Sequence, residues 1–102
     1  MAEWRLTFEI EVSFCGTRPS VWGRDVLRRL TTLDPLPIRA EYNGGENWGS
    51  VEAVFAVDVQ DQLEAVRCQN DIDEKLRAAL KGLKFGITFE NPELAPNKKQ
   101  GS

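Results

Sequence analysis

The sequence of 102 residues predicts an α+β domain of the ferredoxin-like type, a single antiparallel sheet with two helices packed on one face. Apolar and polar residues alternate in four segments, and apolar residues recur every three or four positions in two others. These segments follow the order β-α-β-β-α-β. Each predicted strand has one apolar face and each helix one apolar stripe. A sheet covered by the two helices on one side would bury all of these apolar surfaces in a single core.

Residues 4–14 alternate between apolar and polar side chains, which is typical of a strand with one buried face. Gly16 and Pro19 end this pattern, and Thr17 or Ser20 can cap the helix that follows. That helix is expected over 21–33, with its end at residues 34–37, because proline disfavours helical geometry in the residue before it. Its apolar stripe consists of Trp22, Val26, Leu30 and Leu33.

Two further strands are expected over 38–43 and 50–60, joined by a hairpin turn at Asn43-Gly44. Alternation carried back from Val51 places Trp48 on the polar side of the third strand unless Gly49 forms a bulge. A last strand is expected over 84–90. Right-handed crossovers would set the first and third strands side by side in the middle of the sheet.

Residues 61–83 allow two interpretations. One is a single helix that starts with a capping box of Asp61 and Glu64 and stops at Lys81-Gly82. The other is a short strand over 63–68 and a helix that starts at a second capping box, at residue 71. The single helix is the favoured prediction. We expect residues 1–91 to form one domain and residues 92–102 to form a disordered tail.

Composition excludes several classes of function. The net charge of -3, from 13 basic and 16 acidic residues, is too small to indicate a nucleic-acid partner. The absence of histidine removes the commonest general base and metal ligand, so we expect no enzyme activity, metal or cofactor. Cys15 and Cys68 fit neither a disulfide framework nor a zinc site. They indicate two reduced thiols in a cytoplasmic protein, and the N-terminus resembles neither a signal peptide nor a membrane span.

The charge pattern predicts an acidic open sheet face and a basic first helix. The expected open face has no aromatic residue on its central strands, which excludes RNA recognition by base stacking there. The helix contributes Arg18, Arg24, Arg28 and Arg29 against Asp25 and Asp34. The charged residues expected on the open face are Arg5, Glu9, Glu11, Arg39, Glu41, Glu52, Asp58, Lys84 and Glu90.

We therefore expect a small bacterial or phage protein of inhibitor, immunity or adaptor type that docks a basic protein partner. The residues expected to bind this partner are Glu9, Glu11, Glu52 and Asp58 on the open face, with Asn47 and Trp48 on the hairpin. An alternative is a dimeric regulatory domain that binds a small ligand or anion at loop 15–20 through Gly16, Thr17, Arg18 and Ser20. A homodimer centred on Val54 and Ala56 of the sheet face is a further possibility.

Overall fold

The structure, a computed structural model, describes residues 2–12, 18–45 and 48–95. It is a small α+β domain with one antiparallel sheet and two helices, which confirms the predicted class. Both helices and the expected strands lie close to their predicted positions, and one short strand was not predicted. The elements are β1 (Ala2–Val12), α1 (Pro19–Leu30), β2 (Arg39–Gly44), β3 (Gly49–Val59), α2 (Gln62–Ala79), β4 (Phe85–Phe89) and β5 (Glu93–Leu94).

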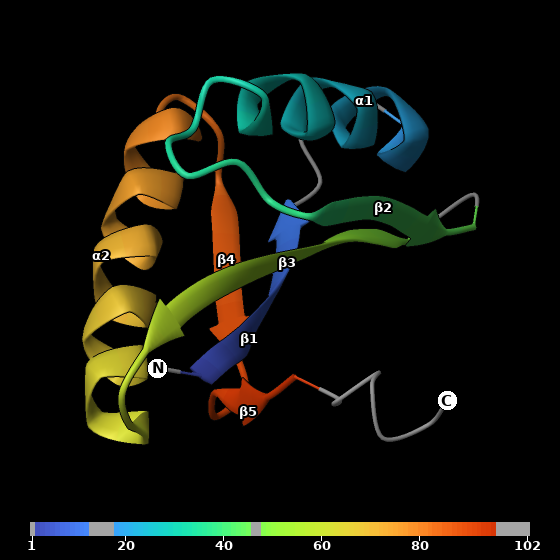
Figure 1. Ribbon diagram of the computed structural model, residues 1–102. Helices are drawn as coiled ribbons and strands as arrows, with labels where there is room; N and C mark the ends of the chain where they lie inside the picture. Colours follow the sequence, from blue (N-terminus) through green and yellow to red (C-terminus); the bar gives the residue numbers. More distant parts are fainter. Residues whose placement is uncertain (1, 13–17, 46–47, 96–102) are drawn as a thin grey trace.

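The sheet has the strand order β2-β3-β1-β4, and β5 pairs with β1 next to β4. The two longest strands, β1 and β3, therefore pair with each other in the interior of the sheet, as the sequence predicts. In Figure 1, α1 lies above β2 and β3, and α2 runs down the left of the view. Each helix contributes to the same hydrophobic core.

The core forms on the even-numbered face of β1 and the odd-numbered face of β3. Their antiparallel register sets Leu6 opposite Phe55 and Ile10 opposite Val51, and all four side chains are fully buried. The rings of Phe8 and Phe55 meet edge to face, with 5.6 Å between centroids and an interplanar angle of 89°. The helices close this core with Trp22, Val26, Leu30, Ala65, Ile72, Leu76 and Leu80, the last of which follows α2 directly.

Residues 62–79 form one continuous helix, which confirms the favoured interpretation. Asp61 caps the helix by accepting a hydrogen bond from the Glu64 amide at 3.0 Å, and the Glu64 carboxylate accepts one from the Gln60 amide at 3.3 Å. The polar stretch in mid-helix does not break it because Gln69 is buried and donates to the Glu90 carbonyl at 2.6 Å. Gly82, with φ of 96°, then ends the helical path.

The first helix begins differently from the prediction. Arg18 is its N-cap residue and makes no side-chain capping bond, and Pro19 occupies the first turn. Proline suits this position because its missing N–H would have no partner within the helix. The predicted cap at Ser20 is therefore wrong, since Ser20 lies inside the first turn, and Thr17 falls outside the described residues. The helix ends at Leu30, three residues before the predicted end.

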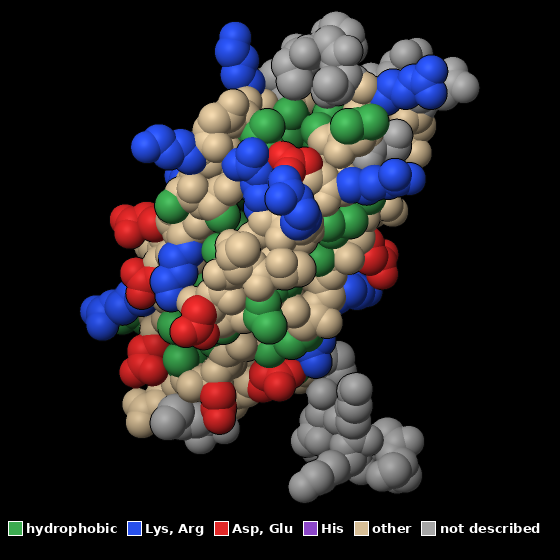
Figure 2. Space-filling view, turned by 90° about the horizontal axis from the view of Figure 1, so that it is seen from above, with side chains coloured by type: hydrophobic (Ala, Val, Ile, Leu, Met, Phe, Trp, Pro, Cys, Tyr) green, Lys and Arg blue, Asp and Glu red, His purple; other side chains and the backbone are tan. Residues whose placement is uncertain are grey.

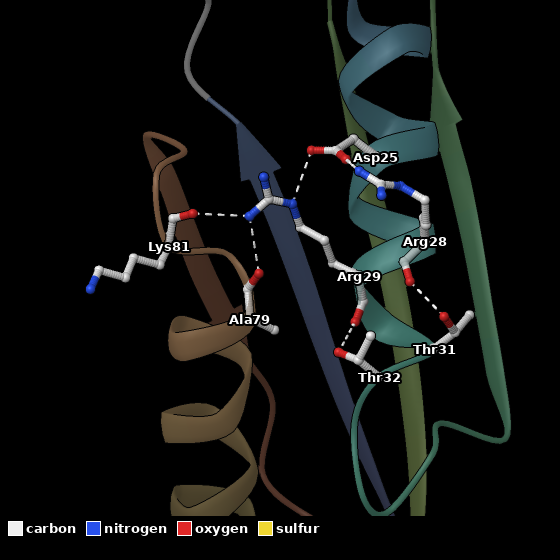
Figure 3. Close-up of polar contacts among 7 residues, drawn as sticks. All are labelled: Asp25, Arg28, Arg29, Thr31, Thr32, Ala79 and Lys81. Atoms are coloured by element: carbon white, nitrogen blue, oxygen red, sulfur yellow. Dashed lines mark hydrogen bonds and ion pairs between the residues drawn. The ribbon is translucent and has the colours of Figure 1, made fainter.

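Arg29 joins the two helices (Figure 3). Its Nη1 atom donates to the carbonyl oxygens of Ala79 at 3.1 Å and Lys81 at 2.9 Å, at the end of α2. These are carbonyl groups that a helix end leaves without partners, and a cation there also matches the helix dipole. Asp25 orients the guanidinium by accepting from its Nε atom at 3.0 Å. Hydrogen bonding from Arg28 is the main cause of a lowered pKa of Asp25; burial opposes it and Arg29 adds to it.

The chain after β4 stays on the sheet rather than leaving it. β4 pairs with β1 as far as Phe89 opposite Phe8, and pairing resumes with Glu93 opposite Arg5. Three residues, 90–92, thus face two residues of β1, which is a bulge. The predicted tail is therefore wrong for residues 92–95, where Pro92 is buried and β5 follows; residues 96–102 lie outside the described residues.

The β2–β3 hairpin is present, but its turn lies later than predicted. Gly44 pairs with Gly49, so Asn43-Gly44 belongs to β2, and the Gly45 amide donates to the Trp48 carbonyl at 2.8 Å. The glycine pair is needed because side chains at either position would overlap the hydroxyl end of Tyr42. The Tyr42 ring also lies against Gly23 of α1, so one aromatic side chain fixes the hairpin beneath the helix.

A substitution at Gly23 tests this packing. We expect Gly23→Ala to destabilise the fold by about 1–3 kcal/mol, because the new methyl group would overlap the Tyr42 ring. This cost outweighs the gain in helix propensity, which is at most about 1 kcal/mol. Urea unfolding measures the difference. The same change at Gly86, where no atom lies within 4 Å of the new methyl group, should have little effect. If Gly23→Ala is equally destabilising in a Tyr42→Ala background, the contact is not the cause.

Candidate interaction surface on the open sheet face

The open face is the side of the sheet opposite the core, formed by the odd-numbered residues of β1 and β2, the even-numbered residues of β3 and β4, and Glu93 of β5. Cross-strand pairing connects these positions directly. In the described strands the open face carries seven acidic side chains and two basic ones. The acidic residues are Glu3, Glu9, Glu11, Glu41, Glu52, Asp58 and Glu93, and the basic residues are Arg5 and Arg39.

Three carboxylates stand in one row across neighbouring strands. Glu41 of β2 lies opposite Glu52 of β3, and Glu52 lies opposite Glu9 of β1. The row ends at Thr88 of β4. Like charges directly opposite each other destabilise a sheet, so this acidic row opposes folding. We call these three residues the acidic row.

Two arginines neutralise part of the face. Arg39 Nη2 lies 2.7 Å from Glu52 Oε1, and Arg5 Nε lies 2.8 Å from Glu3 Oε2. Both are exposed pairs, which typically contribute less than about 1 kcal/mol. Within the described chain, Glu9 and Glu41 form no ion pair, so two members of the acidic row remain uncompensated.

The neighbouring carboxylates and the loss of hydration favour the protonated form of Glu9. The pKa of Glu9 is raised above its ordinary value of 4.5. Loss of hydration at its carboxylate is the first cause, and a hydrogen bond with Glu11 is the second. The charges of Glu11, Glu52 and Glu90 raise the pKa further. Glu9 is therefore crowded by other carboxylates on this face.

A shallow hollow of about 120 Å³ lies beside Glu9. Small-molecule sites usually measure about 300–1,000 Å³, so the hollow is too small for a nucleotide or a sugar. It can receive the end of one side chain from a protein partner. Its lining residues are Thr7, Glu9, Glu52, Thr88, Phe89 and Glu90.

The structure brings four of the predicted partner-binding residues onto the open face: Glu9, Glu11, Glu52 and Asp58. Trp48 lies at the end of the β2–β3 hairpin and is 64% exposed, and Asn47 falls outside the described residues. Glu3 and Glu93 were not predicted on the open face. Glu3 continues the alternation of the first strand, but the strand was expected to begin one residue later, at Trp4. Glu93 lay in the predicted tail, where alternation gave no signal.

Val54 does not provide the apolar centre that a sheet-face homodimer would need. It lies on the open face, but only 6% of its surface is exposed. Its neighbours across the sheet are Thr7 on β1 and Arg39 on β2, whose side chains stand on the same face. The anion-binding alternative rests mainly on Gly16 and Thr17, which lie outside the described residues; Arg18 is exposed.

The basic side chains predicted on the first helix are on the surface. Arg24 and Arg28 are exposed, whereas Arg29 is partly buried in the contact with α2. Figure 2 looks down on the side that α1 forms: Lys and Arg side chains gather over its upper half, and Asp and Glu lie mainly over its lower half. Acidic and basic charges are thus unevenly distributed over the molecule.

No group of three or more metal-ligating side chains in the described ranges could hold a metal ion. No helix in those ranges is long and apolar enough to cross a membrane. No family model matches the sequence, and no curated protein or solved structure matches it either.

Neutralising Glu9 should stabilise the fold at neutral pH. Because folding raises the pKa of Glu9, its ionised form opposes folding, and this penalty appears as pH rises from the unfolded value through the folded one. We expect Glu9→Gln to be more stable than wild type at pH 7 by about 0.5 kcal/mol, the scale of one like-charge cross-strand pair. The difference should vanish below about pH 4 and shrink in 1 M salt.

Thermal unfolding across this pH range measures the effect. Glu74→Gln on the exposed surface of α2 is the matched control and should leave the stability at pH 7 nearly unchanged. A Glu9→Gln variant less stable than wild type at pH 7 would contradict the electrostatic account of the acidic row.

Proposed function

We propose that this protein is a non-enzymatic, cytoplasmic interaction module that binds a basic protein partner through its open face and β2–β3 hairpin. It belongs functionally with small inhibitor, immunity or adaptor proteins. We also propose that its architecture is ferredoxin-like, with β5 as an extension of the fourth strand.

The acidic row carries this proposal. Three adjacent strands place like charges opposite one another, although each such pair costs stability. A partner that supplies cations to Glu9 and Glu41 would offset this cost when it binds. Such electrostatic complementarity raises the association rate and the specificity for the correct partner.

The hairpin supplies a different kind of contact. Trp48 is the most exposed of the large apolar side chains in the described part of the chain. Tryptophan is common among the few interface residues that carry most of the binding energy. We propose that Trp48 contributes apolar contact area at one end of the interface, with Asn47 beside it, while the carboxylates orient the partner.

Charge reversal on the open face tests the proposal. Partners captured from lysate by the wild-type protein are identified by cross-linking and then measured one at a time. We expect Glu9→Lys with Glu11→Lys to slow association with a true partner by at least roughly tenfold at low salt. The loss should diminish as ionic strength rises.

Asp71→Lys with Glu74→Lys is the matched control. It makes the same change in net charge at exposed positions of α2 and should leave association nearly unchanged. If both double variants lose binding equally, net charge alone explains the effect. If neither loses binding, the open face is not the interface.

The alternative function concerns the start of α1. The N-cap residue of this helix makes no side-chain capping bond. Pro19 has no N–H and the Val21 amide donates to the Arg18 carbonyl at 2.9 Å, so the Ser20 amide is the group of this turn that could bind an anion. Titration with phosphate and amino acids, followed by backbone NMR shifts, tests this alternative. Absence of shifts at Gly16 to Ser20 would exclude it.

A further inference from the structure

β2 is an edge strand with a free outer side. It pairs with β3 alone and stands at one end of the strand order. Residues 39–44 contain neither proline nor lysine, two residue types that commonly block strand addition at an edge. The outer backbone groups of β2 are therefore unpaired within the described sheet.

The ladder determines which backbone groups of β2 face outward. The hydrogen bond from Gly45 to Trp48 makes these two residues a hydrogen-bonded pair. Antiparallel pairs alternate between bonded and non-bonded, so residues 43, 41 and 39 direct their amides toward β3. Ala40, Tyr42 and Gly44 direct theirs away from the sheet. At the start of the strand, the Ile38 amide bonds to the Val54 carbonyl at 2.8 Å and ends the free edge.

We infer that the outer edge of β2 pairs with β2 of a second copy of this chain, antiparallel and about a two-fold axis at Ala40. Symmetric registers with an axis at Ala40, Glu41 or Tyr42 each join outward-facing groups. A two-fold axis at Glu41 sets the two Glu41 side chains opposite each other, and an axis at Tyr42 sets Glu41 opposite Asn43. The axis at Ala40 alone sets Arg39 of each copy opposite Glu41 of the other.

This register completes the acidic row. Glu9, Glu52 and Glu41 follow one another across β1, β3 and β2. The next position in the row is occupied by Arg39 of the second copy, so a guanidinium group terminates a line of three carboxylates. Opposite charges on facing strands stabilise a sheet in the same way that like charges destabilise it.

The same register covers exposed apolar surface at the start of β2. Leu36 and Ile38 are 59% and 52% exposed in the single chain. Pairing at Ala40 brings these segments alongside the second copy, whereas the other two registers shift them outward. The contact is short, so the dimer is a weak one that forms at high protein concentration.

Pairing through the edge leaves both open faces on the same side of the joint sheet. A basic partner can still reach them, so this inference does not depend on the proposed function. It also differs from a sheet-face homodimer, which would cover Glu9 and Glu52. Variants at Arg39 and Glu41 therefore test the edge, and variants at Glu9 and Glu11 test the open face.

Sedimentation velocity over a range of concentrations up to millimolar tests the inference. We expect the wild-type chain to dimerise, and Arg39→Glu or Glu41→Arg to weaken dimerisation roughly tenfold, because each change sets two like-charge pairs across the interface. The double exchange of Arg39→Glu with Glu41→Arg should restore it. Arg67→Glu and Glu74→Arg, which make the same changes in net charge on exposed parts of α2, should dimerise as wild type does.

Amide hydrogen exchange gives an independent readout on the wild-type chain. The Ala40 and Tyr42 amides should become protected as concentration rises, while those of Glu41 and Asn43, already bonded to β3, should change little. A chain that stays monomeric at millimolar concentration overturns the inference. So does a dimer in which the double exchange restores nothing or the Ala40 amide gains no protection.

Discussion

The antiparallel register between β1 and β3 is the constraint on which the rest of the molecule depends. It places Leu6 opposite Phe55 and Phe8 opposite Ala53, and the Phe8 and Phe55 rings then meet edge to face in the core. Side chains alternate along a strand, so a slip of one residue would turn these apolar groups toward water. The same register sets Glu9 opposite Glu52 on the other side of the sheet. Core and acidic row are two consequences of one alignment.

This alignment explains how the fold tolerates opposing carboxylates. Burial of a large apolar side chain contributes about 1.5–3 kcal/mol, whereas a like-charge pair on an exposed face costs a fraction of that. Contacts distant from the open face add rigidity: Arg29 holds α1 against the end of α2, and Tyr42 fixes the hairpin under α1. The sheet can therefore present an unfavourable charge pattern without losing its structure.

Alternation and helical periodicity in the sequence were enough to predict the class of fold, the central pair of strands and the acidic face. They could not predict which carboxylates oppose each other, because the offset between strands depends on a hairpin whose turn lies later than Asn43-Gly44 suggests. A side chain at Gly44 would overlap the backbone of Trp48 and Gly49, and one at Gly49 would overlap the Tyr42 ring, contacts that exist only once the two strands are paired. β5 was missed for a similar reason. The bulge over 90–92 interrupts alternation, and two residues are too few to show a period.

The acidic row crosses three strands of the open face but not the fourth, and its end at β2 affects how a cationic partner can bind. Along the acidic row, β2, β3 and β1 each contribute a carboxylate, whereas β4 contributes the neutral Thr88. The neighbouring position of β4 opposite Glu11 is Gly86. The row therefore ends in the carboxylate of Glu41 at the free edge of β2, where Arg39 of the same strand pairs with Glu52 rather than with Glu41. A cation arriving beyond Glu41 would meet this carboxylate directly, whether it comes from Arg39 of a second copy or from a different protein. Glu41 thus belongs both to the acidic row of the open face and to the free edge, while Glu9 lies on β1, away from the edge.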